Sequence, residues 1–378
     1  GWNYPLPYLE IILPIGLSFH TIQAMSYTIE VYRGQQKAER HFGIYSLYVM
    51  FYPQLVAGPI ERPQNLLPQF YEKHEFDYQR VTDGLKLMAW GMFKKTVIAD
   101  RLAPSVNAVY SDPTAYQGMP LVLATVFFAF QIYCDFSGYS DIARGAAQVM
   151  GFNLMVNFKR PYFAKSIDEF WKRWHISLST WFRDYLYISL GGNRVSPARR
   201  NFNLFMTFLV SGLWHGANWT FVVWGALNGL YIMLSLWTKD LRQSFITALR
   251  LHRAPGLLKC LQIVTTFSLI CFAWIFFRAN NLSDAFWIIT HLHSGIIAQL
   301  TTTTSATLPP EISKVELLIA FCAIAVMESA HLLQRRVSVR HWLAQKPVWF
   351  RWGLYYGVAA AILLLGVFNK IQFIYFQF

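Results

Sequence analysis

A histidine near the middle of the chain lies in apolar sequence and has small neighbours. His215 stands between Gly212 and Gly216, and Asn218 follows within one helical turn. Glycines let another group approach an imidazole ring closely, and neutral imidazole is a general base near neutral pH. The pattern favours acid–base chemistry at His215, with Asn218 as a candidate substrate-binding residue. The alternative is that His215 hydrogen-bonds a neighbouring helix.

A second histidine lies in a segment that is both aromatic and basic. Ser166 and Glu169 have the spacing of an N-terminal capping box, so a helix is expected to begin there. The residues that then recur at helical spacing are Trp171, Trp174, His175, Leu178 and Phe182. They predict one basic amphipathic helix that lies in the membrane interface. His175 on its apolar face is either a structural group or a participant in the chemistry, and Trp174 is a candidate substrate contact.

Charged residues interrupt the apolar sequence 121–152. Asp141 and Arg144 are three residues apart and can pair on one helical face. Gly138 is expected to break the helix between Asp135 and Asp141, so that irregular backbone lines a cavity. Charges inside membrane segments are costly and are functional candidates by default. Asp135, Asp141 and Arg144 therefore either fix a helix junction or contact a substrate.

The first apolar segment has a polar face of its own. Its polar residues, three and four positions apart, are His20, Gln23, Ser26 and Tyr27. This spacing is typical of hydrogen bonding between membrane helices, which we expect here.

The elements that must position these residues are membrane-spanning helices. Hydrophobic residues make up 54% of the 378-residue chain and charged residues only 14%. A helix needs about 20 apolar residues to cross a bilayer. The strong candidate spans are 9–29, 121–136, 219–237, 260–277, 315–333 and 353–368, and the weaker ones are 45–57, 85–99, 139–152 and 202–214. Because the sequence lacks alternating barrel strands, we expect an all-α polytopic helical bundle.

The basic residues gather in three segments between the strong spans. Residues 159–200 contain nine basic and three acidic residues, residues 239–259 contain five and one, and residues 334–351 contain five and none. The positive-inside rule predicts that all three are cytoplasmic. This explains the net charge of +13 without nucleic acid as a partner.

This orientation requires an even number of crossings between the basic segments. Residues 201–238 are expected to form a hairpin of two passes, and residues 260–333 two more. The short segment 285–298 is then interfacial, and the polar stretch 301–310 forms a loop on the outside. We expect one domain over residues 1–378. Because motifs for phosphate loops, dinucleotides, zinc and serine hydrolases are absent from the sequence, no bound cofactor or metal is expected.

Six stretches of the sequence resemble the membrane-bound O-acyltransferase family. They are residues 13–34, 51–70, 133–145, 158–194, 211–225 and 373–378. The block from Trp174 to Tyr185 is specific in combination with Trp214, His215 and Gly216. The resemblance covers essentially the whole chain and points to the bacterial branch that acetylates polysaccharides such as alginate. The family's amino-terminal helices are missing before Gly1, so we expect a piece of a longer polypeptide.

The resemblance implies a multi-pass enzyme of the bacterial inner membrane with a tunnel through the membrane. It would take an acyl group, expected to be acetyl, from a cytoplasmic thioester such as acetyl-CoA. It would pass the group towards hydroxyls of an extracytoplasmic polysaccharide, with a periplasmic acyltransferase as partner. The family's principal catalytic histidine corresponds to His215, and its second motif histidine corresponds to His175. Asn228 stands where relatives often have another histidine and is assigned no role.

The residues also suit this chemistry independently of the resemblance. A thioester is already activated, so its transfer needs a base near neutral pH and a site that excludes water. The basic residues of 159–200 can attract the phosphates of coenzyme A. Two other classes stay open: a transporter or flippase of a lipid-linked sugar, which would use the buried charges as a path, and a scaffold that tolerates loss of both histidines.

Overall fold

The computed structural model describes residues 16–296, 299, 313–368 and 373–374. Within these ranges the chain is helical and contains no strand, which confirms the predicted all-α class. The α-helices are α1 (Leu17–Tyr32), α2 (Phe42–Val49), α3 (Pro63–Leu66), α4 (Tyr78–Met92), α5 (Asp100–Ser111), α6 (Met119–Met150), α7 (Ile167–Trp171), α8 (Ile176–Trp181), α9 (Pro197–His215), α10 (Trp219–Trp237), α11 (Lys239–Ala248), α12 (Pro255–Arg278), α13 (Leu282–His291), α15 (Lys314–Gln334), α16 (Val339–Ala344) and α17 (Val348–Leu365). Two π-helical segments, Phe93–Ala99 and Phe182–Tyr187, continue α4 and α8.

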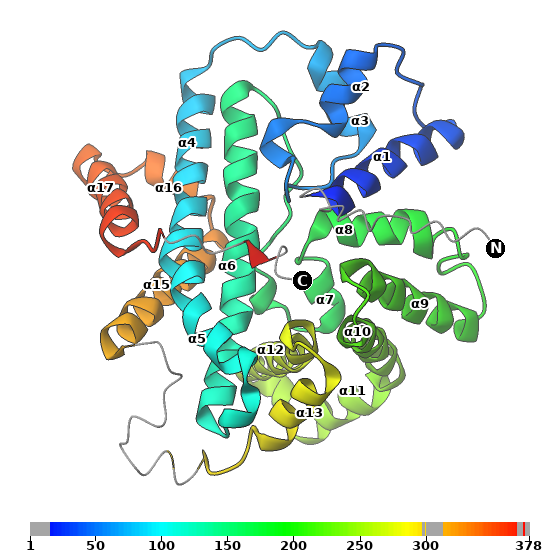
Figure 1. Ribbon diagram of the computed structural model, residues 1–378, viewed down its shortest axis with the longest axis vertical. Helices are drawn as coiled ribbons and strands as arrows, with labels where there is room; N and C mark the ends of the chain where they lie inside the picture. The colour runs from blue at the N-terminus through cyan, green and yellow to red at the C-terminus, as the bar shows by residue number, and fades with distance from the viewer. Residues whose placement is uncertain (1–15, 297–298, 300–312, 369–372, 375–378) are drawn as a thin grey trace, which may run out of the picture.

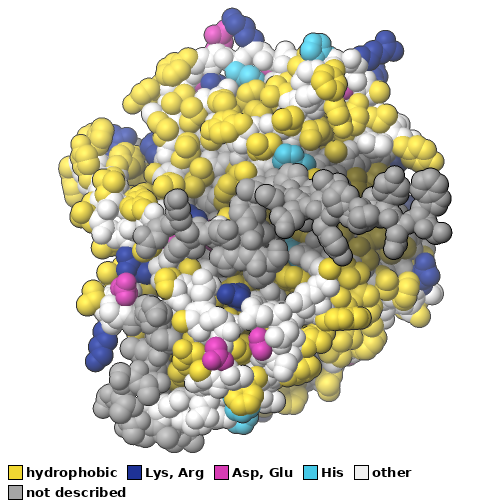
Figure 2. All heavy atoms as spheres, viewed as in Figure 1, with side chains coloured by type: hydrophobic (Ala, Val, Ile, Leu, Met, Phe, Trp, Pro, Cys, Tyr) yellow, Lys and Arg dark blue, Asp and Glu magenta, His cyan; other side chains and the backbone are white. Residues whose placement is uncertain are grey.

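Five of the described helices are long and apolar enough to cross a membrane, namely α6, α10, α12, α15 and α17. The last four coincide with predicted strong spans. No residue of α17 is buried, and large apolar side chains such as Leu363 and Leu364 are exposed. Hydrophobic side chains also cover much of the face drawn in Figure 2. A surface of this kind suits lipid rather than water, as expected of a polytopic membrane protein.

The two predicted segments on either side of Gly138 form one helix, α6, with 32 residues. The prediction that Gly138 breaks the helix is therefore wrong. A Cβ at Gly138 would lie 2.8 Å from the carbonyl oxygen of Gly91 in α4, and one at Gly91 would lie 2.5 Å from that of Gly138. Gly145 and Gly84 make the same contact one heptad away. The four glycines let two antiparallel helices pack with their backbones in contact.

The helices α9 and α10 form a hairpin over residues 201–238, as predicted, but only α10 is among the five candidate spans, so two passes here stay a prediction. A Cβ at Gly212 of α9 would overlap the carbonyl oxygen of Phe221 and lie 3.1 Å from the Cα of Gly225, both in α10. Further along the chain, α13 has ten residues, too few to cross a bilayer, as predicted for this region. The predicted polar loop at 301–310 lies outside the described residues.

The predicted first span, 9–29, is described only from Gly16 onward, as part of α1. The polar face of α1 makes the expected hydrogen bonds to other elements. Gln23 donates to the carbonyl oxygen of Tyr48 in α2 at 2.5 Å. Ser26 accepts the indole N–H of Trp181 in α8 at 2.9 Å. The first bond attaches α1 to α2, and the second attaches it to α8, which begins directly after the second candidate histidine.

The helix α6 lies at the centre of the described fold and is buried along most of its length. In Figure 1, α4 lies along one side of α6, the group α7–α10 lies on the other, and α15–α17 stand beyond α4. The main hydrophobic core includes the buried indoles of Trp174, Trp224 and Trp274. This core holds the α7–α10 group, with both candidate histidines, against α6 and α12.

Candidate active site

The segment predicted as one amphipathic helix forms two short helices, α7 and α8. Ser166 caps α7 by accepting the backbone N–H of Glu169 at 3.2 Å, as the capping spacing predicts. The chain then turns, and His175 adopts a φ of 41° at the start of α8. The backbone N–H of Ile176 donates to the carbonyl oxygen of Asn157 at 2.9 Å. The prediction of one continuous helix is wrong because this bond to another loop holds the turn.

The aromatic face of this segment packs inside the protein. Trp174, His175 and Leu178 are 2%, 2% and 4% exposed. The indole of Trp174 stacks on Phe170 with a centroid distance of 5.5 Å. This corrects the expectation that the face inserts into the membrane interface, and it makes Trp174 a core residue. A contact between Trp174 and substrate stays a prediction.

The imidazole of His175 lies between aromatic side chains of two other helices. Its ring meets Phe136 of α6 edge to face at 4.6 Å and lies at 30° to Phe19 of α1 at 6.1 Å, measured between centroids. A positive φ is uncommon in a residue with a side chain and costs about 1–3 kcal/mol. Such strain gathers at functional sites. The turn therefore strengthens His175 as a candidate for the chemistry.

His215 is the last residue of α9, at the turn into α10. Among the described residues, the rings nearest to it are those of Trp214, Trp224 and Phe277, at 4.8, 5.1 and 5.2 Å between centroids. A Cβ at Gly216 would lie 2.7 Å from the ring of Phe221. The small neighbour of His215 thus admits an aromatic side chain of α10.

The fold brings His175 and His215 together from two separate turns. They are close enough for charges on the two imidazoles to interact. The ring of Phe19 connects their surroundings, because it contacts His175 and also meets Trp214 at 5.8 Å between centroids. Figure 1 shows α7 and α8 beside α9 and α10. Two neighbouring imidazoles in an aromatic lining can divide the work, one accepting a proton and the other orienting a reactant.

Asp141 and Arg144 pair as predicted, with 3.6 Å between their charged atoms. A closer partner of Asp141 comes from the π-helical segment after α4. The ammonium group of Lys94 lies 2.8 Å from Asp141 and donates to the hydroxyl of Ser137 at 2.9 Å. Lys94 is not among the residues expected from the sequence, although two adjacent lysines in an apolar segment indicate a functional or structural role.

Asp135 is held by the neighbouring lysine and by the end of the chain. Lys95 lies 2.7 Å from Asp135 and 2.8 Å from Asp100 of α5. The backbone N–H of Ile374 donates to Asp135 at 2.7 Å. These bonds connect α5, α6 and the carboxyl-terminal residues, which supports a role in fixing a helix junction. A substrate contact by Asp135, Asp141 or Arg144 stays a prediction.

Both polar ends of the Asn218 amide hold the turn after His215. Its oxygen accepts the backbone N–H of Thr220 at 3.1 Å, and its nitrogen donates to the carbonyl oxygen of Asn280 at 2.8 Å. Asn218 thus caps α10 and ties the turn to the loop before α13. Its predicted substrate contact is untested. Asn228 is fully buried and donates to the carbonyl oxygen of Trp224 at 2.9 Å.

Another buried histidine, besides His175, lies beside this site. His331 of α15 is 4% exposed, and its Nε2 lies 3.2 Å from the hydroxyl of Tyr133 in α6. Its Nδ1 lies 3.3 Å from the carboxylate of Glu328. The ring of Tyr133 is 6.1 Å from Trp174, next to His175. A lone histidine inside a predicted span has no spacing pattern, so His331 could not be selected from the sequence.

A buried carboxyl group outside the spanning helices was also missed. Glu61 lies in the loop before α3 and is fully buried. Its oxygens accept N–H groups of Asn65 and Met155, each at 2.5 Å. Burial nevertheless raises the pKa of Glu61 to about 7. This carboxyl group therefore titrates near neutral pH.

The fold gathers the three basic segments of the sequence. Lys172 and Arg242, from the first two, line a cavity of about 450 Å³. Lys259 and Arg335, from the last two, line another of about 550 Å³. This proximity is what one common cytoplasmic side requires. Neither lining includes a candidate histidine, and the predicted tunnel stays a prediction.

Comparisons with known proteins extend over the elements that carry both histidines. Residues 12–277 match the family model of the membrane-bound O-acyltransferases. The chain is 40% identical over 336 residues to a probable alginate O-acetylase of Azotobacter vinelandii, which covers 85% of this chain and 62% of that protein. It is 43% identical over 284 residues to a probable alginate O-acetylase of Pseudomonas aeruginosa, and this match covers 74% of this chain and 52% of that protein. It is 36% identical over 323 residues to a peptidoglycan O-acetyltransferase of Helicobacter pylori, and this match covers 76% of this chain and 58% of that protein.

The matched regions thus span between about half and three fifths of these relatives. The family model includes the α7–α8 turn with His175 and the α9–α10 turn with His215. Several helices long enough to cross a membrane accompany the match. The chain is a multi-pass membrane protein and belongs to the membrane-bound O-acyltransferase family.

Proposed function

We propose that this chain carries the acyl-transfer site of a membrane O-acyltransferase that acts on polysaccharide. The observation that carries the proposal is that His175 and His215 lie at two separate helix interruptions whose aromatic surroundings join where Phe19 contacts Trp214. The relatives named as O-acetylases and as an O-acetyltransferase support the reaction class. They also favour acyl transfer over transport of a lipid-linked sugar.

In the proposed reaction, His215 is the general base. Its neutral imidazole takes the proton of an acceptor hydroxyl while the hydroxyl oxygen attacks the thioester carbon. A carbon–oxygen bond forms, the carbon–sulfur bond breaks, and the proton passes to the departing thiolate. The thioester is the only activated reactant, so the step needs no further cofactor.

His175 is proposed as the residue that orients a reactant beside His215. Its strained turn and its contacts with Phe136 and Phe19 fix the direction of its ring. A fixed group in a water-excluding site positions a reactant at little entropic cost. The contribution of His175 is therefore expected to be smaller than that of His215.

The donor is proposed to be acetyl-CoA, reached from the cytoplasmic side where the three basic segments gather. The acceptor is proposed to be an extracytoplasmic polysaccharide such as alginate, reached through a membrane tunnel with a periplasmic acyltransferase as partner. The location is then the bacterial inner membrane. The names of the relatives support the polysaccharide class, and the positive-inside rule supports the orientation.

Transfer of labelled acetyl groups from acetyl-CoA by membranes that contain the full-length protein tests this proposal. His215→Ala is expected to lower turnover by about 10²–10⁴-fold, the usual contribution of a general base. His252→Ala is the matched control, because His252 is exposed in the loop before α12. Near-normal turnover by folded His215→Ala protein contradicts the assignment.

A further inference from the structure

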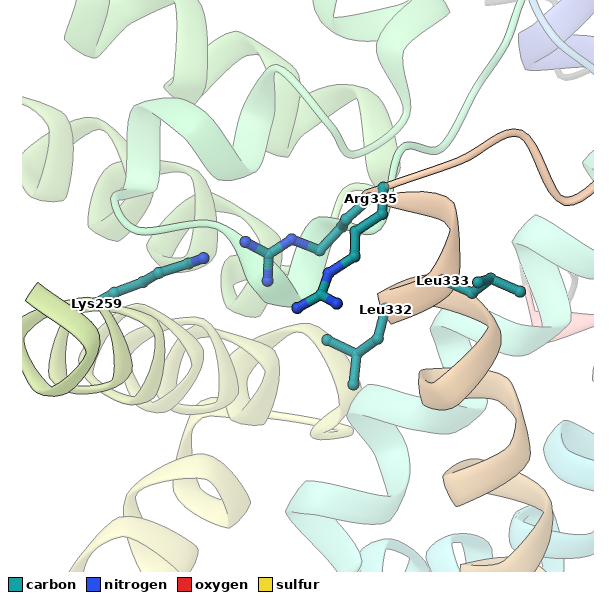
Figure 3. Close-up of a pocket in the computed structure, with 5 residues that line it drawn as sticks. Lys259, Leu332, Leu333 and Arg335 are labelled. Atoms are coloured by element: carbon teal, nitrogen blue, oxygen red, sulfur yellow. The ribbon is translucent and has the colours of Figure 1, made fainter. Parts of the chain in front are cut away.

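A cavity of about 550 Å³ opens between the start of α12 and the end of α15. Its lining consists of Lys259, Leu332, Leu333, Arg335 and Arg336. In Figure 3 the side chain of Lys259 extends from α12 across the gap towards the arginine side chains at the end of α15. Basic groups from two helices that are far apart in sequence thus converge on one space.

The charge in this cavity is uncompensated within the described part of the chain. The salt bridges found there include neither Lys259, Arg335 nor Arg336, and the cavity lining contains no carboxylate. The guanidinium of Arg335 lies over the ring of Phe163 at 5.6 Å. Like charges held together repel one another. An anion is therefore the ligand that this arrangement fits best.

A fourth cation, Arg160, lies outside the cavity lining but near Arg335. Charges on Arg160 and Arg335 are close enough to interact, and Arg160 holds a left-handed backbone conformation with φ of 51°. The Nη1 atom of Arg160 is buried and has no hydrogen-bond partner among the described residues. Guanidinium groups match phosphate oxygens in geometry as well as in charge. The lining arginines, Arg335 and Arg336, therefore favour a ligand with several acceptor oxygens.

The other wall of the cavity is apolar. Leu332 and Leu333 end the spanning helix α15, and Leu332 is 49% exposed. A ligand that fits both walls carries phosphate at one end and an apolar or weakly polar chain at the other. Inorganic phosphate would leave the leucines unused.

We propose that this cavity binds the phosphate groups of a phosphate-bearing amphiphile. Two sources share this chemistry, a coenzyme A thioester and the headgroup of an anionic phospholipid, since basic pockets between membrane helices also hold such headgroups. The coenzyme A source rests on the proposed function, whereas phosphate binding as such does not. The site is separate from His215, which the lining does not include.

Binding of two probes to the full-length protein tests the proposal without any turnover. The first probe is labelled coenzyme A, added to protein in phosphatidylcholine nanodiscs. The second is phosphatidylglycerol, whose retention is measured by native mass spectrometry. The variant is Lys259→Ala/Arg335→Ala/Arg336→Ala. Loss of about fivefold in affinity for each basic group predicts about 100-fold weaker binding of one probe.

The matched control is Lys239→Ala/Arg253→Ala/Lys314→Ala, which removes the same charge from exposed residues outside the cavity. Arg336→Gln alone, a milder change, is expected to weaken the same probe about fivefold. Weakened coenzyme A binding identifies the donor as the ligand, and weakened phosphatidylglycerol retention identifies a lipid. If the cavity variants bind both probes as the control does, the proposal is overturned. Failure of the proposed function has another signature, normal acetyl transfer by His215→Ala with coenzyme A binding unchanged.

Discussion

Buried polar groups have different surroundings in two regions of the molecule. One region is the contact between α4 and α6, and the other is the site around the two histidines. Beside the glycine contact of α4 with α6, the carboxylates of Asp135 and Asp141 are matched by Lys95 and Lys94 at 2.7 and 2.8 Å. Around His175 and His215, aromatic rings from four helices form the surroundings. The first region uses charge to hold helices together, and the second encloses titratable rings at helix ends. Charge inside a membrane segment is therefore not in itself a sign of catalysis.

The largest expected effect on stability comes from breaking the charged region. Lys95→Met leaves Asp100 and Asp135 buried, at 5% and 3% exposure, without their common cation. Loss of one partner of a buried pair costs about 3–5 kcal/mol. We expect a clearly lower Tm in thermal unfolding of the purified protein. Lys94→Met is the comparison, because Asp141 keeps Arg144. If Lys95→Met leaves the Tm unchanged, the proposal that these charges have a structural role is contradicted.

A smaller effect is expected from the glycine contact in the same region. Gly91→Ala places a Cβ 2.5 Å from the backbone oxygen of Gly138, and backbone cannot move aside as a flexible side chain can. Overpacking of this kind costs about 1–3 kcal/mol. Gly256→Ala is the control, since nothing lies within 4 Å of its Cβ position. If the two variants have the same Tm, then α4 and α6 can move apart at this contact without loss of stability.

The smallest effect is a change in the pH dependence of stability. The pKa of Glu61 is about 7 in the folded protein against a usual value of 4.5. The folded state then binds the proton more tightly, so this group lowers stability as pH rises from about 4.5 to 7. Glu61→Gln cannot titrate and should flatten the decline in Tm between pH 5 and 7.5, whatever its effect at a single pH. Parallel Tm profiles of the two proteins would contradict the raised pKa.

The spanning helices could be predicted because length and apolar composition alone define them. The span 219–237 coincides with α10, and the hairpin of α9 with α10 follows from the basic segments on either side. The error at Gly138 has a local cause. Glycine at a possible helix break and glycine at a helix contact look alike in one sequence, and only the partner helix with Gly91 distinguishes them.

The two candidate histidines could be selected from the sequence, but the arrangement of the segments around them could not be predicted. The motifs identified His175 and His215, whereas the turn between α7 and α8 depends on a hydrogen bond with Asn157, which lies 19 residues before Ile176. The periodicity of a sequence reflects only the spacing of side chains along one segment. The predicted helix therefore continued through this turn. Lys94 and His331 were missed for a related reason, because their partners lie on other helices.

The central claim is that His175 and His215 serve one reaction site. The most direct test is a double-mutant cycle of His175→Ala and His215→Ala, with kcat and KM measured for acetyl transfer by the full-length protein. We expect a smaller loss for His175→Ala than for His215→Ala, and a double variant little worse than His215→Ala, because residues that act as a unit are not additive. Equal single losses that multiply in the double variant would contradict a shared site.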